Sequence, residues 1–368
     1  MTIASIRLFR QWQPFRDGAY RCSGGRSAEG FDSTIVEIVA RDGAAGHGEM
    51  APLGSFYDPA FAEGARAAMR ELAPKLIGEK ADGIDAINRR MDLLLKGHPY
   101  AKSAIDMALW DLAGRRSGLS LATMTGGAEG DSVPLYRSLA QEAPEAMASR
   151  ARKYVAEGYR RLQVKVGLDV REDIERLEAV RAAIPADIVI FCDANGSWGT
   201  VETRQFLLAT RSIDYALEQP CGTYDENLAI RRACDRPLIL DETIDGVDAL
   251  LRGLADSLLD GITIKLARVG GLTKARLIRD IAVARNLKIT VEDTGGAEID
   301  TAAYSGLMLS TPASLRQHTV DFQNWVTVSN ARADFKIADG RMSPPDGPGL
   351  GIEVDKSTLG EPIFSCSA

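Results

Sequence analysis

The chain has 368 residues, of which 45% are hydrophobic, 26% charged and 6% aromatic, and its formal net charge is −7. This length predicts about two globular domains with sizeable cores, and no apolar run approaches the roughly 18 residues of a membrane-spanning helix. Acidic net charge without Lys/Arg runs argues against a nucleic-acid-binding protein. Five scattered cysteines without a CxxC pair, and no secretory signal, predict a cytoplasmic protein without disulfides or a zinc site.

Residues 1–127 are predicted to form an α+β domain, because strand-like alternation is followed by helical periodicity. Two glycine-rich loops in it, 15–27 and 50–60, carry Tyr20, Phe56 and Tyr57. Small residues with aromatic tips are typical of mobile lids, although the same rings would also suit a packed domain interface. The expected strands are 3–13 and 34–41, and the expected helices are 58–76, 83–95 and 99–117.

Residues 128–340 alternate short β-branched runs with amphipathic helical segments, which predicts an α/β fold of the TIM (β/α)8 barrel type. A doubly wound open sheet is the alternative, but its usual GxGxxG turn does not follow the first run. Residues 341–368 are rich in Pro and Gly yet too apolar for a free tail, so they are expected to pack back onto the protein. The expected barrel strands are 133–139, 161–167, 187–195, 213–220, 236–243, 260–268, 288–293 and 314–321.

Three acidic residues, Asp193, Glu218 and Asp241, end the third, fourth and fifth of these runs. Catalytic groups of a barrel sit at the carboxyl ends of its strands, and neighbouring strands lie about 4.8 Å apart, so the three carboxylates should converge. Like charges that close repel each other unless a cation lies among them. Ligands that are all oxygen favour Mg²⁺, with Mn²⁺ as the alternative, over zinc. The competing interpretation is that each carboxylate caps the following helix.

Two lysines, Lys165 and Lys265, end the second and sixth runs and should face each other across the barrel. Strand alternation points them inward, on the same side as Gln163 and Thr263. Burial and a nearby cation would lower a lysine pKa and make the side chain a general base. A Schiff-base lysine is the alternative for either one alone. Two lysines with three carboxylates predict proton transfer at a carbon next to a metal-bound carboxylate.

Further polar residues lie near the same rim. Glu242 follows a predicted metal ligand and Arg268 follows a predicted base, so both are candidates for supporting these groups. His318, at the end of the eighth run, is either a substrate hydrogen-bonding group or a satisfied core histidine. Carboxylates also end the last two runs, at Glu292 with Asp293 and at Asp321.

Short motifs of the chain lie at the expected strand ends and in the N-terminal domain. They are QVKVG (163–167), CDANGSW (192–198), EQP (218–220), DET (241–243), IKLARVGGLT (264–273), EDTGG (292–296), SAIDMALWDLAG (103–114) and GHGEM (46–50). Taken together, these motifs resemble the enolase superfamily, in the subgroup typified by muconate lactonizing enzyme, over essentially the whole chain.

The resemblance implies that residues 1–127 cap the mouth of a modified barrel and that 341–368 return to this capping domain. It also implies Mg²⁺ ligands at Asp193, Glu218 and Asp241, and an acid/base pair at Lys165 and Lys265. The usual KxK of the second strand begins here with Gln163, which alters the surroundings of Lys165.

Within the subgroup, the chain is most similar to enzymes of proline derivatives, the cis-3-hydroxy-L-proline dehydratases and the hydroxyproline betaine 2-epimerases. The betaine enzymes carry an aromatic residue after the seventh strand, where this chain has Thr294 and Gly295. A free imino acid has N–H donors that Asp293 or Asp321 would accept, and Tyr57 and Thr294 complete the expected substrate site. The resemblance therefore implies dehydration of cis-3-hydroxy-L-proline to Δ1-pyrroline-2-carboxylate, by a homo-oligomer acting on a small imino acid. Epimerase or racemase side activity, or betaine 2-epimerisation as the main reaction, are the alternatives.

Other relatives and a non-catalytic role fit less well. Dipeptide epimerases hold the substrate amine with a DxD on the eighth strand, and this chain has Asp321-Phe322-Gln323. Muconate cycloisomerases need no amine anchor, so the acidic residues near the mouth disfavour them. A binding protein built on a degenerate barrel would be expected to have lost a metal ligand, and none is missing.

Overall fold

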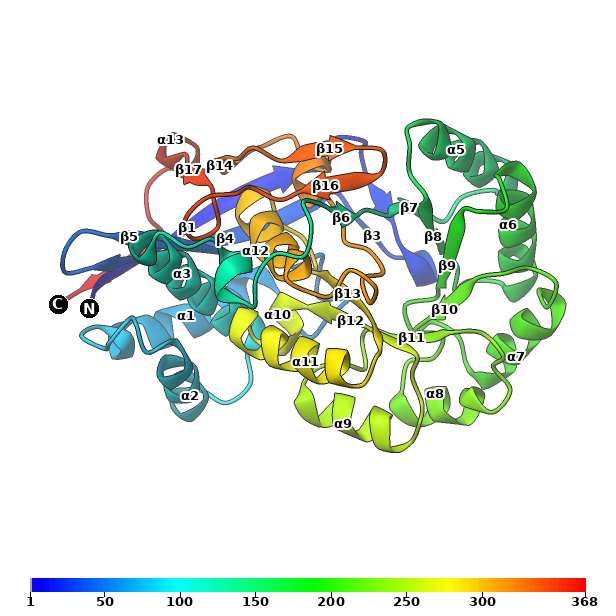
Figure 1. Ribbon diagram of the computed structural model, residues 1–368, viewed down its shortest axis with the longest axis horizontal. Helices are drawn as coiled ribbons and strands as arrows, with labels where there is room; N and C mark the ends of the chain where they lie inside the picture. The colour runs from blue at the N-terminus through cyan, green and yellow to red at the C-terminus, as the bar shows by residue number, and fades with distance from the viewer. Residues whose placement is uncertain (1) are drawn as a thin grey trace.

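The computed structural model describes residues 2–368 and shows a capping domain packed beside a curled sheet ringed by helices (Figure 1). The capping domain is built on a four-stranded antiparallel sheet in the order β18-β1-β4-β5. Its edge strand comes from the far end of the chain, so the two termini lie side by side (Figure 1). The strands are β1 (Ile3–Pro14), β4 (Gly30–Ala40), β5 (Ala45–Met50) and β18 (Phe364–Ser367).

Three helices of this domain are α1 (Ala62–Leu76), α2 (Ile84–Leu94) and α3 (Pro99–Ser117). α3 is buried almost throughout because it packs on β5 on one side and on α10 (Leu266–Val269) of the barrel on the other. The close approach to β5 needs Gly48, since a Cβ there would clash with the backbone oxygen of Ala104. No helix within residues 2–368 is both long and apolar enough to cross a membrane.

The second domain is a parallel sheet in the order β13-β12-β11-β10-β9-β8-β7, which curls into an incomplete barrel. Its strands are buried along almost their whole length, as expected of strands covered on both faces. They are β7 (Arg137–Leu139), β8 (Arg161–Lys165), β9 (Val189–Asp193), β10 (Ala216–Glu218), β11 (Leu238–Leu240), β12 (Gly261–Lys265) and β13 (Lys288–Glu292). The surrounding helices are α5 (Pro144–Ala156), α6 (Val170–Ala183), α7 (Thr200–Ala209), α8 (Tyr224–Arg231), α9 (Val247–Ala255), α11 (Leu272–Ala284) and α12 (Glu298–Leu309).

The eighth expected strand, 314–321, is not a regular strand. Gln317 N donates to Ile289 O and Thr319 N donates to Pro134 O, both at 2.8 Å, so this segment closes the barrel by isolated bridges. The first expected strand, 133–139, is also divided, into β6 (Val133–Pro134) and β7. A proline has no N–H for a ladder, and β6 pairs instead with β16 (Arg341–Ser343).

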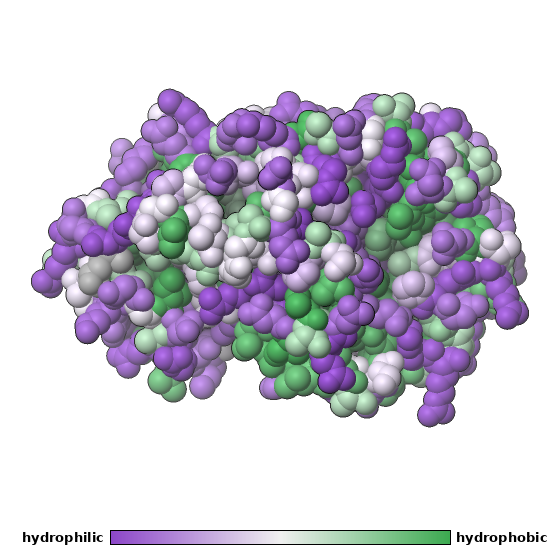
Figure 2. Space-filling view, in the orientation of Figure 1, coloured by the Kyte–Doolittle hydropathy of each residue, from purple (hydrophilic) through white to green (hydrophobic). Residues whose placement is uncertain are grey.

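Most of the visible surface is hydrophilic, with smaller hydrophobic areas between the charged side chains (Figure 2). That distribution is ordinary for a globular protein.

Candidate active site

The strand register brings the predicted carboxylates and lysines to one rim. Lys165 pairs in register with Asp193, and Asp193 with Glu218. On the other side of the barrel, Lys265 is in register with Glu292, and Asp241 directly follows β11. All of these side chains are buried. The predicted convergence of acidic and basic groups is therefore present at the carboxyl ends of the strands.

The two lysines are held by carboxylates. Lys165 Nζ lies 2.5 Å from Asp193 Oδ2, and Lys265 Nζ lies 3.2 Å from both Asp241 Oδ2 and Glu292 Oε1. Burial works to lower the pKa of both lysines, but these carboxylates outweigh it and raise the pKa above the ordinary value. Burial alone therefore does not give the lowered lysine pKa expected of a general base, because each ammonium has a buried carboxylate against it, and the expected effect of a cation stays a prediction.

Glu218 accepts hydrogen bonds from two uncharged donors, Gln163 Nε2 at 2.9 Å and Thr263 Oγ1 at 2.8 Å. Burial, together with the charges of Asp193 and Asp241, raises its pKa well above the ordinary value. Gln163, which stands where the family usually has a lysine, therefore positions this carboxylate without neutralising it.

Loop 50–60 reaches the rim through two side chains. Tyr57 Oη donates to Asp241 Oδ2 at 2.9 Å and lies 2.5 Å from Lys265 Nζ. Asp58 pairs with Arg268, whose guanidinium also contacts Asp241. Burial opposes ionisation of Asp241, yet Arg268 and Lys265 bring its pKa to about 2. Nothing in the sequence indicated the contact between Asp58 and Arg268, because these two residues lie 210 positions apart.

Glu242 supports the rim from behind. Its Oε1 accepts from Asn195 Nδ2 at 2.9 Å, while its Oε2 is buried without a hydrogen-bond partner among residues 2–368. Burial and the charges of Asp241 and Asp193 raise its pKa to about 8. This side of the rim therefore crowds together more carboxyl groups than its cations neutralise, so part of them is held in the protonated form.

The donor set tests whether a divalent cation fits. Asp193, Glu218 and Asp241 offer only oxygen ligands, which suits Mg²⁺, and their mutual repulsion and the unpartnered Glu242 oxygen both favour added positive charge. Within residues 2–368 no three acidic, histidine or cysteine side chains are already grouped as a metal site, since Lys165 and Arg268 contact two of the carboxylates directly. The three residues fit the ion by chemistry and position, and protein cations are paired with two of them, Asp193 and Asp241.

A cavity of about 40 Å³ lies between the two lysines, and we call it the catalytic cavity. Glu292 and Asp293 are the acidic residues among its lining. Aromatic rings that the sequence had not placed there, those of Tyr136, Phe322 and Trp325, form much of its wall. The lining comprises Tyr20, Cys22, Leu53, Tyr57, Tyr136, Gln163, Lys165, Asn195, Lys265, Glu292, Asp293, Thr294, Phe322 and Trp325.

The predicted substrate-binding residues take different positions. Tyr57 lines the cavity, and so do Asp293 and Thr294. The Asp293 carboxylate, however, accepts from the backbone N–H of Ala267 at 3.0 Å and of Thr294 at 2.8 Å. Thr294 Oγ1 donates to Ala51 O at 3.0 Å. Asp293 is therefore engaged within the barrel, and Thr294 joins the barrel to the capping domain.

Asp321 is buried but is not among the residues that line the catalytic cavity. Its carboxylate accepts from Asn324 Nδ2 at 3.0 Å and lies 3.4 Å from Arg137 Nη1. His318 packs between the rings of Tyr136 and Phe191, with centroids 4.5 and 4.3 Å away. Burial lowers its pKa well below the ordinary value, so it is a neutral core histidine.

Loop 15–27 lies over the rim beside loop 50–60. Ser23 Oγ donates to Asp193 O at 3.0 Å. Arg26 bridges the two loops and the barrel, donating to Phe56 O at 3.2 Å and to Asn195 O at 3.3 Å. Both loops thus cover the cavity in this structure, and their mobility as lids stays a prediction.

Two family models match the chain. Residues 27–126 match the mandelate racemase / muconate lactonizing enzyme N-terminal domain, and residues 146–358 match the enolase C-terminal domain-like family. The chain is 46% identical to a cis-3-hydroxy-L-proline dehydratase of Roseibium aggregatum, over 99% of both chains. It is 27% identical to an N-succinyl-L-Arg/Lys racemase of Bacillus cereus, over 98% of both.

Solved structures agree with these matches. A mandelate racemase/muconate lactonizing enzyme relative from Roseovarius nubinhibens, complexed with magnesium, superposes with a TM-score of 0.96 at 36% identity, and each chain is covered completely. A relative from Aspergillus oryzae gives a TM-score of 0.92 at 36% identity, with 99% of both chains covered. With the capping sheet, the curled parallel barrel and the acidic and basic residues at its strand ends, the chain belongs to the enolase superfamily, in its mandelate racemase/muconate lactonizing enzyme group.

Proposed function

We propose that this enzyme removes the α-proton of a proline-type imino acid, and that its main reaction is dehydration of cis-3-hydroxy-L-proline to Δ1-pyrroline-2-carboxylate. The observation that carries the proposal is the pair of buried lysines lining one cavity from β8 and β12, strands separated by three others in the sheet. Two acid/base groups on opposite sides of a carbon suit both inversion and anti elimination. The dehydratase relative at 46% identity supports elimination.

The chain's own residues account for the proton transfers. In cis-3-hydroxy-L-proline the hydroxyl and the α-hydrogen lie on opposite ring faces. One lysine, as the free amine, takes the α-proton, and the other, as the ammonium, protonates the hydroxyl as the C3–O bond breaks and water leaves. The resulting enamine tautomerises to the cyclic imine, so no redox cofactor is needed. Tyr57 positions Lys265 through its hydroxyl, and loops 15–27 and 50–60 exclude water from the intermediate.

Asp193, Glu218 and Asp241 would hold a divalent cation, and their oxygen ligands favour Mg²⁺. The cation would stabilise the negative charge that develops on the substrate carboxylate. It would also compete with the lysines for the carboxylates of Asp193 and Asp241. These ligands end neighbouring strands.

Glu292 is the proposed acceptor for the substrate's ring N–H. Asp293 has its oxygens engaged by backbone N–H groups, and Asp321 lies outside the cavity lining. Glu292 remains as a cavity carboxylate whose Oε1 lies 3.2 Å from the flexible ammonium of Lys265, beside the hydroxyl of Tyr136. A charged acceptor for an ammonium N–H contributes about 1.5–3 kcal/mol, so a Glu292→Gln variant should raise the KM for an imino acid at least tenfold.

A second candidate, 2-epimerisation of a hydroxyproline betaine, is favoured by the aromatic lining. Faces of Trp and Tyr attract a quaternary ammonium, and Trp325, Tyr20 and Tyr136 line the cavity although no aromatic follows β13. The absence of an aromatic at Thr294–Gly295 is therefore offset by rings from other segments.

¹H NMR in D₂O with Mg²⁺ separates these reactions in one experiment. Samples of cis-3-hydroxy-L-proline, L-proline and 4-hydroxyproline betaine show elimination, α-proton exchange or inversion directly. We expect loss of the ring signals of cis-3-hydroxy-L-proline, with slower exchange of L-proline. A higher kcat/KM for the betaine would reverse the choice of substrate, and no change in any α-proton would overturn the proposed function.

A further inference from the structure

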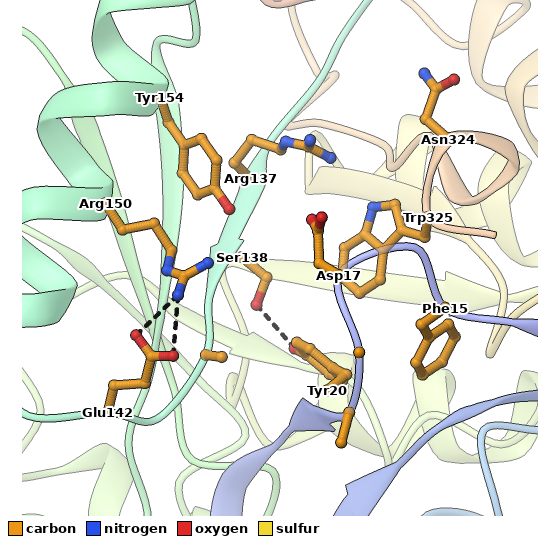
Figure 3. A pocket seen from close by; sticks show the side chains of 13 residues that line it. Phe15, Asp17, Tyr20, Arg137, Ser138, Glu142, Arg150, Tyr154, Asn324 and Trp325 are labelled. Atoms are coloured by element: carbon orange, nitrogen blue, oxygen red, sulfur yellow. Dashed lines mark hydrogen bonds and ion pairs between the residues drawn. The ribbon is translucent and has the colours of Figure 1, made fainter. Parts of the chain in front are cut away.

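A second recess, which we call the outer recess, adjoins the catalytic cavity. The two share Tyr20 and Trp325, whose ring centroids lie 5.1 Å apart. The outer recess has a cavity volume of about 120 Å³, larger than the catalytic cavity. Tyr20 Oη and Ser138 Oγ, 2.8 Å apart, tie the tyrosine ring to β7 (Figure 3). The two rings therefore form a partition between a larger chamber and the lysines.

The barrel wall of the outer recess carries two arginines, Arg137 and Arg150, and one carboxylate, Glu142 (Figure 3). Arg150, on α5, contacts both oxygens of Glu142 through Nη2, at 3.0 and 3.1 Å. Arg137, on β7, lies 3.4 Å from Asp321. Both side chains stay partly exposed where they line the recess, 22% for Arg137 and 39% for Arg150. A guanidinium with free N–H groups is a preferred partner of a carboxylate.

The facing wall comes from loop 15–27 and carries the opposite charge. Asp17 is exposed, and its carboxylate extends into the space between Arg137 and Trp325 (Figure 3). It makes no ion pair or hydrogen bond within the described chain. Unlike charges on facing walls complement a zwitterion, whose carboxylate would meet the arginines and whose ammonium would meet Asp17.

We propose that the outer recess is a binding site for the zwitterionic imino acid, occupied before the molecule passes Tyr20 and Trp325 into the catalytic cavity. The imino acid as ligand rests on the proposed function, whereas the arginines by themselves require only a small carboxylate. Because Asp17 and Tyr20 belong to the same loop, a ligand held there contacts both the cover and the barrel. Such a site raises the rate of capture and leaves the chemical step unchanged.

Arg150→Ala tests the site, with Arg152→Ala as the matched control. Arg152 lies on the same helix, is exposed, is absent from the recess lining and has no partner within residues 2–368. We expect Arg150→Ala to lower kcat/KM about five- to twentyfold with kcat within twofold, as for a lost charge-assisted hydrogen bond. Arg150→Lys should restore part of the loss, and Arg152→Ala should match the wild type. Unchanged kcat/KM in Arg150→Ala, or an equal loss in Arg152→Ala, would overturn the site.

Asp17→Asn provides a second kinetic variant that cannot disturb packing, because the side chain is exposed and unpartnered. We expect a kcat/KM about threefold lower for the zwitterionic substrate, by loss of a solvent-exposed charge contact. No change with Asp17→Asn would remove the ammonium half of the proposal.

Binding of acetate gives a readout that does not depend on turnover. Acetate is too small to be a substrate, and Trp325 in the partition should report its binding by fluorescence. We expect equal Kd values for the wild type and Arg152→Ala, and a Kd at least fivefold higher for Arg150→Ala. An unaltered Kd in Arg150→Ala, or no binding to the wild type, would overturn the outer recess as a carboxylate site. Failure of the enzyme to dehydrate cis-3-hydroxy-L-proline would overturn the proposed function and leave this titration valid.

Discussion

The capping sheet and the barrel mouth each bury charged side chains, with opposite balances of charge. In the capping sheet, the buried Glu37 lies among cations: Arg7 Nη1 at 3.0 Å, Lys356 Nζ at 2.6 Å and His47 Nε2 at 3.4 Å. At the barrel mouth the carboxylates outnumber the cations. The buried carboxyl groups there are Asp193, Glu218, Asp241 and Glu292, with the half-buried Glu242 beside them, and the cations are Lys165, Lys265 and Arg268.

The difference between the two regions appears in the pKa values of their carboxyl groups. The contact with His47, opposed by burial and aided by Lys356, lowers the pKa of Glu37 to about 2. Burial and like charges instead raise the pKa of Glu218 and of Glu242. A balanced cluster contributes to stability, whereas accumulated like charge is costly for folding and marks a site kept for binding and chemistry.

Removing one carboxylate from the mouth should have the largest effect. Glu218→Gln deletes a proposed cation ligand, so we expect activity to fall at least about a thousandfold, within the range of lost electrostatic stabilisation. Because the substitution also relieves repulsion, the free energy of unfolding should stay equal or rise. Turnover assays with Mg²⁺ and urea unfolding measure the two quantities. Full wild-type activity after exhaustive chelation would contradict the cation requirement.

Removing either lysine should rank next. Lys165→Ala and Lys265→Ala should each lose about 10²- to 10⁴-fold in kcat, the usual contribution of a general acid or base. Each single variant should keep α-proton exchange with one enantiomer of proline, because the opposite lysine remains. Exchange of both enantiomers at the wild-type rate in both variants would mean that neither lysine is the base.

A substitution in the buried charge cluster of the capping sheet should change the stability of the protein and leave its activity unaffected. Glu37→Gln leaves cations around a neutral amide, so we expect the free energy of unfolding at pH 7 to fall by about 1.5–3 kcal/mol with kcat within twofold. Since the folded pKa of Glu37 is lowered to about 2, its contribution is present above its ordinary range near 4.5 and is lost as pH falls toward 2. Urea unfolding at several pH values should therefore show wild type and variant converging in acid. A difference that is constant with pH would contradict the assignment.

Tyr57→Phe should give the smallest effect, about tenfold in kcat. It removes one hydroxyl that contacts Asp241 and Lys265, worth roughly 1.4 kcal/mol for a hydrogen bond to charged groups. Tyr224→Phe is the matched control, because Tyr224 Oη donates to Asp256 at 2.6 Å on the outer helices. Equal losses in both variants would show that Tyr57 acts only through stability.

The metal ligands and lysines could be predicted because each depends on a local pattern, a polar residue ending an apolar strand. The same two-residue alternation places Glu292 on the inward side with Thr290. The predicted acceptor of the substrate N–H was nevertheless the next residue, Asp293. Backbone N–H groups of Ala267 and Thr294 decided the position of Asp293. The prediction of a regular eighth strand over 314–321 was wrong. The segment has a strand-like run of residues, but its pairing is limited to single bridges.

Contacts between distant segments could not be predicted. Arg268 meets Asp58 and Tyr57 from across the domain boundary, and no periodicity encodes which loop residue lies opposite which strand end. Trp325 lines the catalytic cavity although it follows the last barrel segment in the sequence. Because it does not end a strand, the strand pattern could not predict its place in the cavity wall. Sequence therefore predicts what each strand presents, and tertiary packing decides what faces it.

The pairing of β18 with β1 also affects how the protein is made. Ser5 is opposite Ser367 and Leu8 is opposite Phe364, so β1 acquires one of its two neighbours only after residue 364 has been synthesised. The whole barrel is translated in the interval, while the open side of β1 stays available to any other extended chain. A ribosome stalled within the barrel would thus hold a nascent chain prone to pairing with its neighbours on the same message.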